Sequence, residues 1–181
     1  MRTRAILKRG LNVIAAARPR IVLELGCGNG RDTHTLSQLP DVKVIAIDWD
    51  HKALSTAPTH TNVFYVRADV TRLPLATRAV GAAYSFGLLQ VLSHGGDSPL
   101  RNFLRELARV LRTDAPTIIG TLADFQRHGG LERSLTGAEV SKAMRGVFIL
   151  RELIGTMDAE DEIRQTRYWY IYATPISNTE V

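Results

Sequence analysis

The sequence has few of the features that mark secreted, membrane-bound or metal-dependent proteins. Its one cysteine, Cys27, cannot form an intramolecular disulfide, which fits a reducing compartment such as the cytoplasm. No apolar run approaches the roughly 18 residues of a membrane span, and Lys8, Arg9 and Arg18 interrupt the only candidate signal-peptide region. The histidines are scattered along the chain, and no two of them stand with a third ligand residue at the spacing of a metal site. We therefore predict a soluble, cytoplasmic protein with no membrane association and no metal site.

Acidic residues are absent from the first twenty positions, where six basic residues stand: Arg2, Arg4, Lys8, Arg9, Arg18 and Arg20. An uncompensated basic segment can attract an anionic acceptor, an RNA or a membrane surface. The plainer interpretation, which we favour, is a solvated amphipathic helix. Its inward side consists of four aliphatic residues, Ile6, Leu7, Leu11 and Ile14.

Apolar runs alternate with helical segments along the chain. Seven runs have the composition of strands: 21–25, 42–47, 63–67, 80–86, 117–121, 148–154 and 167–173. Strands that alternate with helices favour a doubly wound, Rossmann-like α/β fold with a mostly parallel sheet. No helical pattern separates the last two runs, so they are expected to form an antiparallel pair at one edge. The acidic stretch 158–162 between them is interpreted as a turn.

Four helices are predicted after the first one, over residues 32–39, 51–56, 98–111 and 136–145. Ser98 has the position of an N-cap with Pro99 directly after it, and Thr136 with Glu139 has the spacing of a capping box. The third of these helices carries a continuous apolar stripe. Its arginines on the other side are expected only to meet water: Arg101, Arg105, Arg109 and Arg112.

The strongest local signal is the segment ELGCGNG, residues 24–30, between a predicted strand and a predicted helix. Glycines at alternate positions, Gly26, Gly28 and Gly30, let the chain turn sharply and bring bare backbone against a ligand. The following helix start offers free N–H groups. The third glycine comes one residue earlier than in the dinucleotide fingerprint, which disfavours a nicotinamide dehydrogenase.

Carboxylates follow the next two predicted strands. Asp48 ends the second strand and can accept ribose hydroxyls, while Trp49 beside it can stack on an adenine. Asp69 follows the third strand, and its carboxylate with the backbone N–H of Val70 suits the edge of an adenine. Each residue alone could equally be a turn or core residue. Together with the glycine motif upstream they favour a nucleoside site.

These three sites resemble those of the class I S-adenosylmethionine-dependent methyltransferases, over residues 22–121. The segment from Arg109 to Thr117 is also similar to the helix-to-strand stretch of that superfamily, and residues 26–36 resemble tellurite-resistance and thiopurine-type enzymes. The resemblance implies S-adenosylmethionine as the cofactor. It implies that Glu24 and the glycine loop hold the methionine end, and that Ser85 and Phe86 face the transferred methyl. The implied cofactor-binding residues are Glu24, Gly26, Cys27, Gly28, Gly30, Asp48, Trp49, Asp69, Val70, Ser85 and Phe86.

The chain departs from the superfamily pattern at three places, none of which removes a cofactor contact. Val80-Gly81 stands where Phe-Asp is common, Gln90-Val91 replaces a pair of histidines, and Thr113-Asp114-Ala115 replaces Pro-Gly-Gly. These departures leave no obvious catalytic base. Four residues near the predicted mouth are weak candidates, His94, Tyr84, Asp97 and His34. Methyl transfer needs a base only if the acceptor must lose a proton.

We expect methyl transfer to a small-molecule nucleophile. In this interpretation residues 1–181 form one domain, with a basic N-terminal helix (1–19) that covers the cofactor pocket, a cofactor-binding core (20–121) and a substrate-side part (122–181). An RNA or tRNA methyltransferase is the main alternative, supported by the basic N-terminus, although aromatic residues for base stacking are only 7% of the chain. A non-catalytic partner subunit that keeps the fold is a further alternative. The acceptor, the methylated atom and the oligomeric state do not follow from the sequence.

Overall fold

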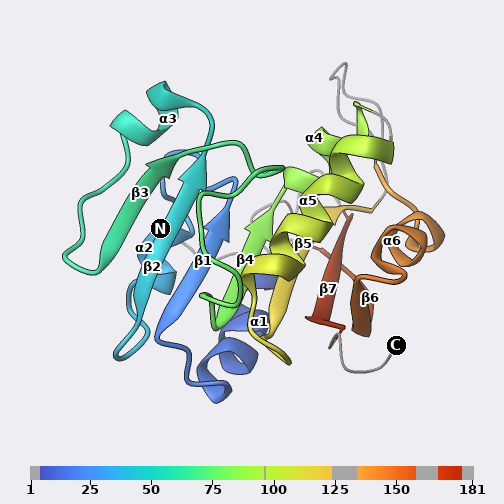
Figure 1. Ribbon diagram of the computed structural model, residues 1–181, viewed down its shortest axis with the longest axis horizontal. Coiled ribbons are helices and arrows are strands. Elements are labelled where there is room, and N and C mark those ends of the chain that lie inside the picture. The colour runs from blue at the N-terminus through green and yellow to red at the C-terminus, as the bar shows by residue number, and fades with distance from the viewer. Residues whose placement is uncertain (1–4, 96, 124–133, 158–166, 177–181) are drawn as a thin grey trace.

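A seven-stranded sheet with the order β3-β2-β1-β4-β5-β7-β6 forms the centre of the molecule (Figure 1). The structure is a computed structural model that describes residues 5–95, 97–123, 134–157 and 167–176. Five strands run parallel: β1 (Ile21–Leu25), β2 (Lys43–Asp48), β3 (Val63–Arg67), β4 (Ala82–Phe86) and β5 (Thr117–Leu122). Strand β7 (Arg167–Pro175) runs antiparallel to β5 and to the edge strand β6 (Phe148–Met157). The predicted doubly wound fold and its antiparallel pair are confirmed.

Six helices lie among the described residues: α1 (Ala5–Ala16), α2 (Thr33–Leu36), α3 (His51–Ser55), α4 (Leu88–Ser93), α5 (Asp97–Val110) and α6 (Gly137–Met144). The capping box of Thr136 and Glu139 at the start of α6 is present as predicted. The N-cap assigned to Ser98 is wrong, because α5 already begins at Asp97. Pro99 is tolerated there because the N–H groups of the first turn of a helix have no hydrogen-bond partner within the helix.

Several other predicted boundaries differ from the structure. Helix α2 ends at Leu36, three residues before the predicted end, and β4 begins at Ala82 because Val80 makes only an isolated bridge to Leu111. Helix α4 was not predicted at all. Its six residues are too few to show a helical period. The acidic stretch 158–162 lies outside the described residues.

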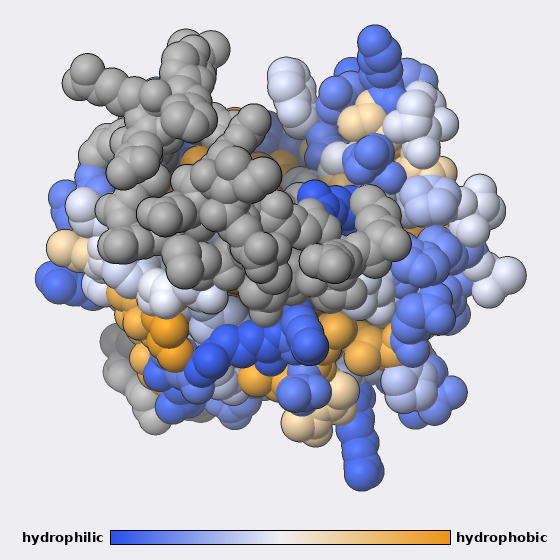
Figure 2. Space-filling model, turned by 180° about the vertical axis from the view of Figure 1, so that it is seen from behind, coloured by the Kyte–Doolittle hydropathy of each residue, from blue (hydrophilic) through white to orange (hydrophobic). Residues whose placement is uncertain are grey.

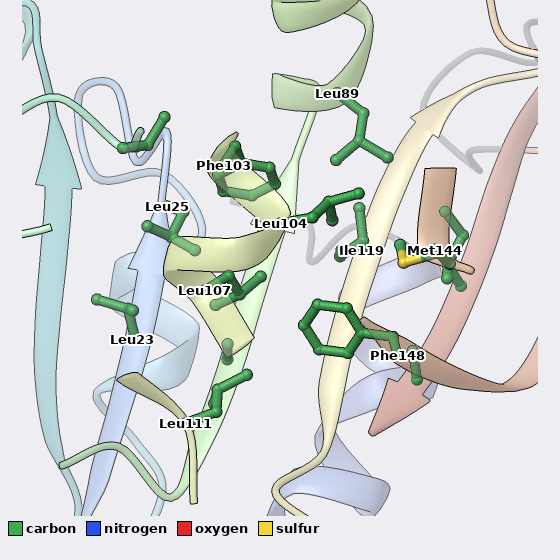
Figure 3. Close-up of a cluster of buried hydrophobic side chains, with 14 of the residues drawn as sticks. Leu23, Leu25, Leu89, Phe103, Leu104, Leu107, Leu111, Ile119, Met144 and Phe148 are labelled. Carbon is green, nitrogen blue, oxygen red and sulfur yellow. The ribbon is translucent and has the colours of Figure 1, made fainter. Parts of the chain in front are cut away.

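Two apolar clusters hold helices to opposite faces of the sheet. The larger one joins α5 and α6 to the sheet, and its fully buried centre includes Leu104, Leu107 and Ile119 (Figure 3). On the other face, Ile6 and Leu7 of α1 are buried in the second cluster. Burial of such side chains stabilises the fold by roughly 1.5–3 kcal/mol each.

The apolar side of helix α1 is buried as predicted, but none of its described residues lines the pocket at the carboxyl edge of the sheet. It packs against β4, β5 and β6. The Arg9 guanidinium lies 3.1 Å from a carboxylate oxygen of Glu152 and 4.9 Å from the ring centroid of Tyr170. Arg9 therefore anchors α1 to the last two strands, and its charge is partly compensated.

Arg109 was predicted only to meet water, and the structure corrects this. Its guanidinium donates to both carboxylate oxygens of Glu106 and to the carbonyls of Leu73 (3.0 Å) and Leu75 (2.9 Å). Glu106 in turn accepts from the backbone N–H of Leu73 at 2.9 Å. The other three arginines of that prediction are exposed. Arg109 and Glu106 thus tie the segment after β3 to α5.

The rear of the molecule shows hydrophobic residues in separate groups between hydrophilic ones (Figure 2). Among the helices that the structure describes, none has the length and apolar character needed to cross a membrane. Because β1 to β5 are parallel, their carboxyl ends meet at one edge, and the strand order reverses between β1 and β4. Ligands of doubly wound proteins bind at such a reversal.

Candidate cofactor and active site

The glycine loop, residues 26–30, joins β1 to the segment before α2. Gly26, Gly28 and Gly30 all have left-handed backbone angles, with φ of 70°, 53° and 78°. The N–H groups of Gly26 and Cys27 donate to the Ile47 carbonyl at 2.8 and 3.1 Å. A Cβ on Gly30 would lie 2.5 Å from the Tyr65 hydroxyl, whereas a Cβ on Gly28 would meet nothing within 4 Å. Gly30 is therefore required for packing, and Gly28 faces open space.

Asp48 links the glycine loop to the end of β2. One carboxylate oxygen accepts from the Gly28 N–H at 2.7 Å, and the other accepts from the Asp50 N–H at 2.9 Å. The side chain is 9% exposed and still lines the pocket described below. Because a carboxylate has about four lone-pair sites, Asp48 can keep both bonds and accept further hydroxyl donors.

Glu24 lies behind the loop. Its side chain is 3% exposed and accepts a hydrogen bond from the Thr33 hydroxyl at the start of α2. Cys27 is also buried, and burial raises the pKa of its thiol far above the ordinary value of 9.0, with the charges of Glu24 and Asp48 adding to the effect. Cys27 is therefore protonated at neutral pH, whereas a nucleophilic cysteine would have to be a thiolate.

A pocket of about 440 Å³ opens at the carboxyl ends of β1 to β4. Six of the predicted cofactor-binding residues line it together: Gly26, Asp48, Trp49, Asp69, Val70 and Phe86. Further lining comes from α4 and its start, which the sequence analysis missed: Gly87, Leu88, Val91 and Leu92. The apolar run after Gly87 was the available signal. Trp49 and Val91 are 78% and 53% exposed, so the mouth of the pocket is apolar.

Asp69 and Val70 stand together on the pocket wall after β3. One Asp69 carboxylate oxygen accepts from both the N–H and the hydroxyl of Thr71, each at 2.8 Å. These bonds fix the carboxylate while the residue stays exposed. Val70 is 8% exposed. Asp69 and Val70 both line the pocket, and their contact with an adenine edge stays a prediction.

Ser85 and Phe86 were expected to face the transferred methyl together, but only Phe86 lines the pocket. Ser85 is 1% exposed and donates its hydroxyl to the Leu25 carbonyl at 3.0 Å. The physical reason is that adjacent residues of a strand point to opposite faces. Phe86 also stacks at a tilt against Tyr168, with 5.1 Å between ring centroids.

Three of the four weak candidates for a catalytic base, Tyr84, His94 and His34, do not line the pocket. Tyr84 is 1% exposed, and its hydroxyl donates to Asp32. His94 is exposed at the end of α4, and exposed His34 lies 5.2 Å from the His60 ring. Asp97 is the first residue of α5. In the described parts of the chain, no group of three or more His, Cys, Asp or Glu residues is placed to hold a metal.

The arrangement fits a nucleoside. Open space beside Gly28 leaves room for a ligand against bare backbone, and Asp48 supplies acceptors at the end of β2. The apolar walls and the exposed Trp49 suit an aromatic base. Fold and site together define a doubly wound protein whose pocket at the topological switch point suits a nucleoside.

Residues 22–114 match the family described as a methyltransferase domain. This match covers more than half of the chain, so the protein belongs to that family, in the class I methyltransferase superfamily, and S-adenosylmethionine is its cofactor. No curated protein sequence matches the chain.

Solved structures share the fold at low sequence identity. A SAM-dependent methyltransferase from Aquifex aeolicus is 20% identical, with a TM-score of 0.72 over 94% of this chain and 89% of that chain. The 1,6-didemethyltoxoflavin-N1-methyltransferase of Burkholderia thailandensis is also 20% identical, with a TM-score of 0.74 over 96% of this chain and 79% of that chain. A chain from the complex between the Haloferax volcanii Trm112 methyltransferase activator and a methyltransferase is 16% identical. Its TM-score is 0.71 over 96% of this chain and 95% of that chain.

Proposed function

We propose that this protein transfers the methyl group of S-adenosylmethionine to a small-molecule nucleophile. The observation that carries the proposal is the convergence of the Gly26 turn, Asp48 and Asp69 on one pocket at the carboxyl edge of the sheet. The Burkholderia thailandensis neighbour, solved with 1,6-didemethyltoxoflavin and S-adenosylhomocysteine, supports a small acceptor. When bound, the cofactor supplies a methyl group on a sulfonium, which a nucleophile displaces in line.

Each part of the pocket has a role in this proposal. Asp48 accepts the ribose hydroxyls, and Asp69 with the Val70 N–H binds the adenine edge beside Trp49. The glycine loop holds the methionine end, with Glu24 buried behind the loop and bonded to Thr33, and Phe86 covers the reacting side. The apolar lining excludes water and aligns the reactants, which by itself can lower the barrier by about 7–11 kcal/mol.

The test is calorimetric titration with S-adenosylmethionine and S-adenosylhomocysteine. Asp48→Asn keeps an acceptor oxygen for the Gly28 N–H but removes the charge that strengthens bonds to hydroxyls. We expect cofactor affinity to fall about tenfold, or about 1.4 kcal/mol. Asp114→Asn is the matched control, since Asp114 lies in the turn before β5, away from the pocket. Affinities that are equal in both variants and the wild type would contradict the assignment of Asp48.

The acceptor class needs a separate measurement. We expect formation of S-adenosylhomocysteine with members of a panel of small thiols, phenols and nitrogen heterocycles. Total tRNA is the comparison substrate, because RNA methylation is the alternative that the basic N-terminus supports. Product formation with tRNA and with no member of the panel would contradict the small-molecule proposal.

A further inference from the structure

Two buried carboxylates connect the segment after the glycine loop to two different strands. The Thr33 hydroxyl donates a hydrogen bond to the carboxylate of Glu24 in β1. Asp32, directly before Thr33, accepts a hydrogen bond of 2.9 Å from the Tyr84 hydroxyl of β4. Asp32 is 7% exposed and Tyr84 is 1% exposed. The two residues are 52 positions apart in the sequence, so only the folded sheet brings them together.

Asp32 is near the glycine loop in the sequence, and backbone hydrogen bonds of the following turn connect the two. Asp32 follows Gly30 by two residues, and the Asp32 carbonyl accepts from the N–H groups of Thr35 and Leu36. The Gly30 carbonyl accepts from the His34 N–H within the same turn. A shift of Asp32 therefore moves the end of the glycine loop and the start of α2 as one unit.

Burial strengthens this bond. A hydroxyl that donates to a carboxylate forms one of the stronger hydrogen bonds in proteins, and the low dielectric of the interior strengthens it further. Tyr84 reaches Asp32 from the strand next to β1, on the side of the sheet that α1 covers. It does not line the pocket, so its hydroxyl is not placed to exchange a proton with an acceptor.

We infer that Tyr84 is a positioning residue for cofactor binding, which acts through Asp32 on the conformation of the glycine loop. The inference rests on the proposed cofactor site and adds a residue to it. It also replaces the catalytic role that the sequence analysis considered for Tyr84.

The experiment compares Tyr84→Phe with Tyr170→Phe. Tyr170 is a second tyrosine with 1% exposure in the same apolar cluster as Tyr84, away from the loop. We expect Tyr84→Phe to weaken binding of S-adenosylmethionine and S-adenosylhomocysteine about tenfold, while Tyr170→Phe stays within about twofold of the wild type. Backbone amides of residues 26–36 should exchange hydrogen faster in Tyr84→Phe alone.

A double-mutant cycle with Asp32→Asn shows whether the two residues act together. If they do, Tyr84→Phe/Asp32→Asn binds the cofactor about as weakly as the weaker single variant. The inference would be overturned if the double variant lost cofactor affinity by the product of the two single losses. It would also be overturned if the affinity of Tyr84→Phe stayed within twofold of the wild type. Failure of the wild type itself to bind either ligand would instead contradict the proposed function.

Discussion

At the scale of single residues, Gly28 is the position where the proposed contact between bare backbone and cofactor can be tested. Its φ of 53° is left-handed, and the space beside it is open. Gly146 has the same two properties, with a φ of 76°, but lies between α6 and β6. An added Cβ strains the backbone at both glycines, but it could block a ligand only at Gly28. Comparing the two positions therefore distinguishes the effect of backbone strain from the effect of blocking a ligand.

We predict that Gly28→Ala and Gly146→Ala lower the free energy of unfolding by similar amounts, about 1–2 kcal/mol, because both place a Cβ in the left-handed region. Only Gly28→Ala should also weaken S-adenosylmethionine binding, by about tenfold or more. Thermal unfolding and calorimetry measure the two effects. A Gly28→Ala variant that binds the cofactor as tightly as Gly146→Ala would show that the ligand does not pass this glycine.

At the scale of elements, α5 holds the segment that carries the adenine-binding candidates. Its Glu106 accepts from the Leu73 N–H, and Arg109 bonds the carbonyls of Leu73 and Leu75. Leu73 follows Val70 closely in the sequence. The position of Asp69 and Val70 on the pocket wall therefore depends on a helix of which no described side chain lines the pocket.

The hydrogen bond from Arg109 holds the pKa of Glu106 below its ordinary value of 4.5. A carboxylate whose pKa is lowered in the folded state adds stability above its unfolded pKa, and this stability is lost as the pH falls through the folded pKa. Because both side chains are partly exposed, we predict that Glu106→Gln lowers the free energy of unfolding at pH 7 by about 0.5–1 kcal/mol. Urea unfolding should show this difference shrinking from roughly pH 5 to pH 3, with no such change for Asp114→Asn. A difference that does not depend on pH would contradict this account.

At the scale of the whole molecule, the basic N-terminal segment separates the two enzymatic interpretations. Arg9 is paired with Glu152, so its reversal would disturb the docking of α1. Lys8, Arg18 and Arg20 are exposed and can be changed without breaking that ion pair. They are the described cations of this segment best suited to test whether it binds a polyanion.

We predict that total tRNA binds negligibly to the wild type and to a variant with Lys8, Arg18 and Arg20 all changed to Glu. The reason is that part of the segment's charge serves the fold, through Arg9. Filter binding across a salt series is the measurement. Submicromolar binding that weakens steeply with salt and disappears on charge reversal would favour an RNA acceptor instead.

Much of the fold and of the cofactor site was predictable from local patterns. The alternation of apolar runs predicted all seven strands, and β1 and β3 have the predicted bounds. The spacing of the glycines and the acids after two strands placed Gly26, Asp48 and Asp69, which do line one pocket. These patterns succeed because burial and backbone conformation act over neighbouring residues, and because parallel strands bring their carboxyl ends to one edge.

The partners of individual side chains were decided by the tertiary structure. Arg109 bonds carbonyls more than 30 positions away, Tyr84 reaches Asp32 across the sheet, and Ser85 turns from the pocket to the Leu25 carbonyl. None of these contacts has a local signature, because a hydrogen bond depends on which groups the packed strands and helices bring within about 3 Å. The sequence alone therefore determined the layers, the glycine turn and the acids at the strand ends. Only the packed sheet decided which side chains face the pocket and which hold its walls in place.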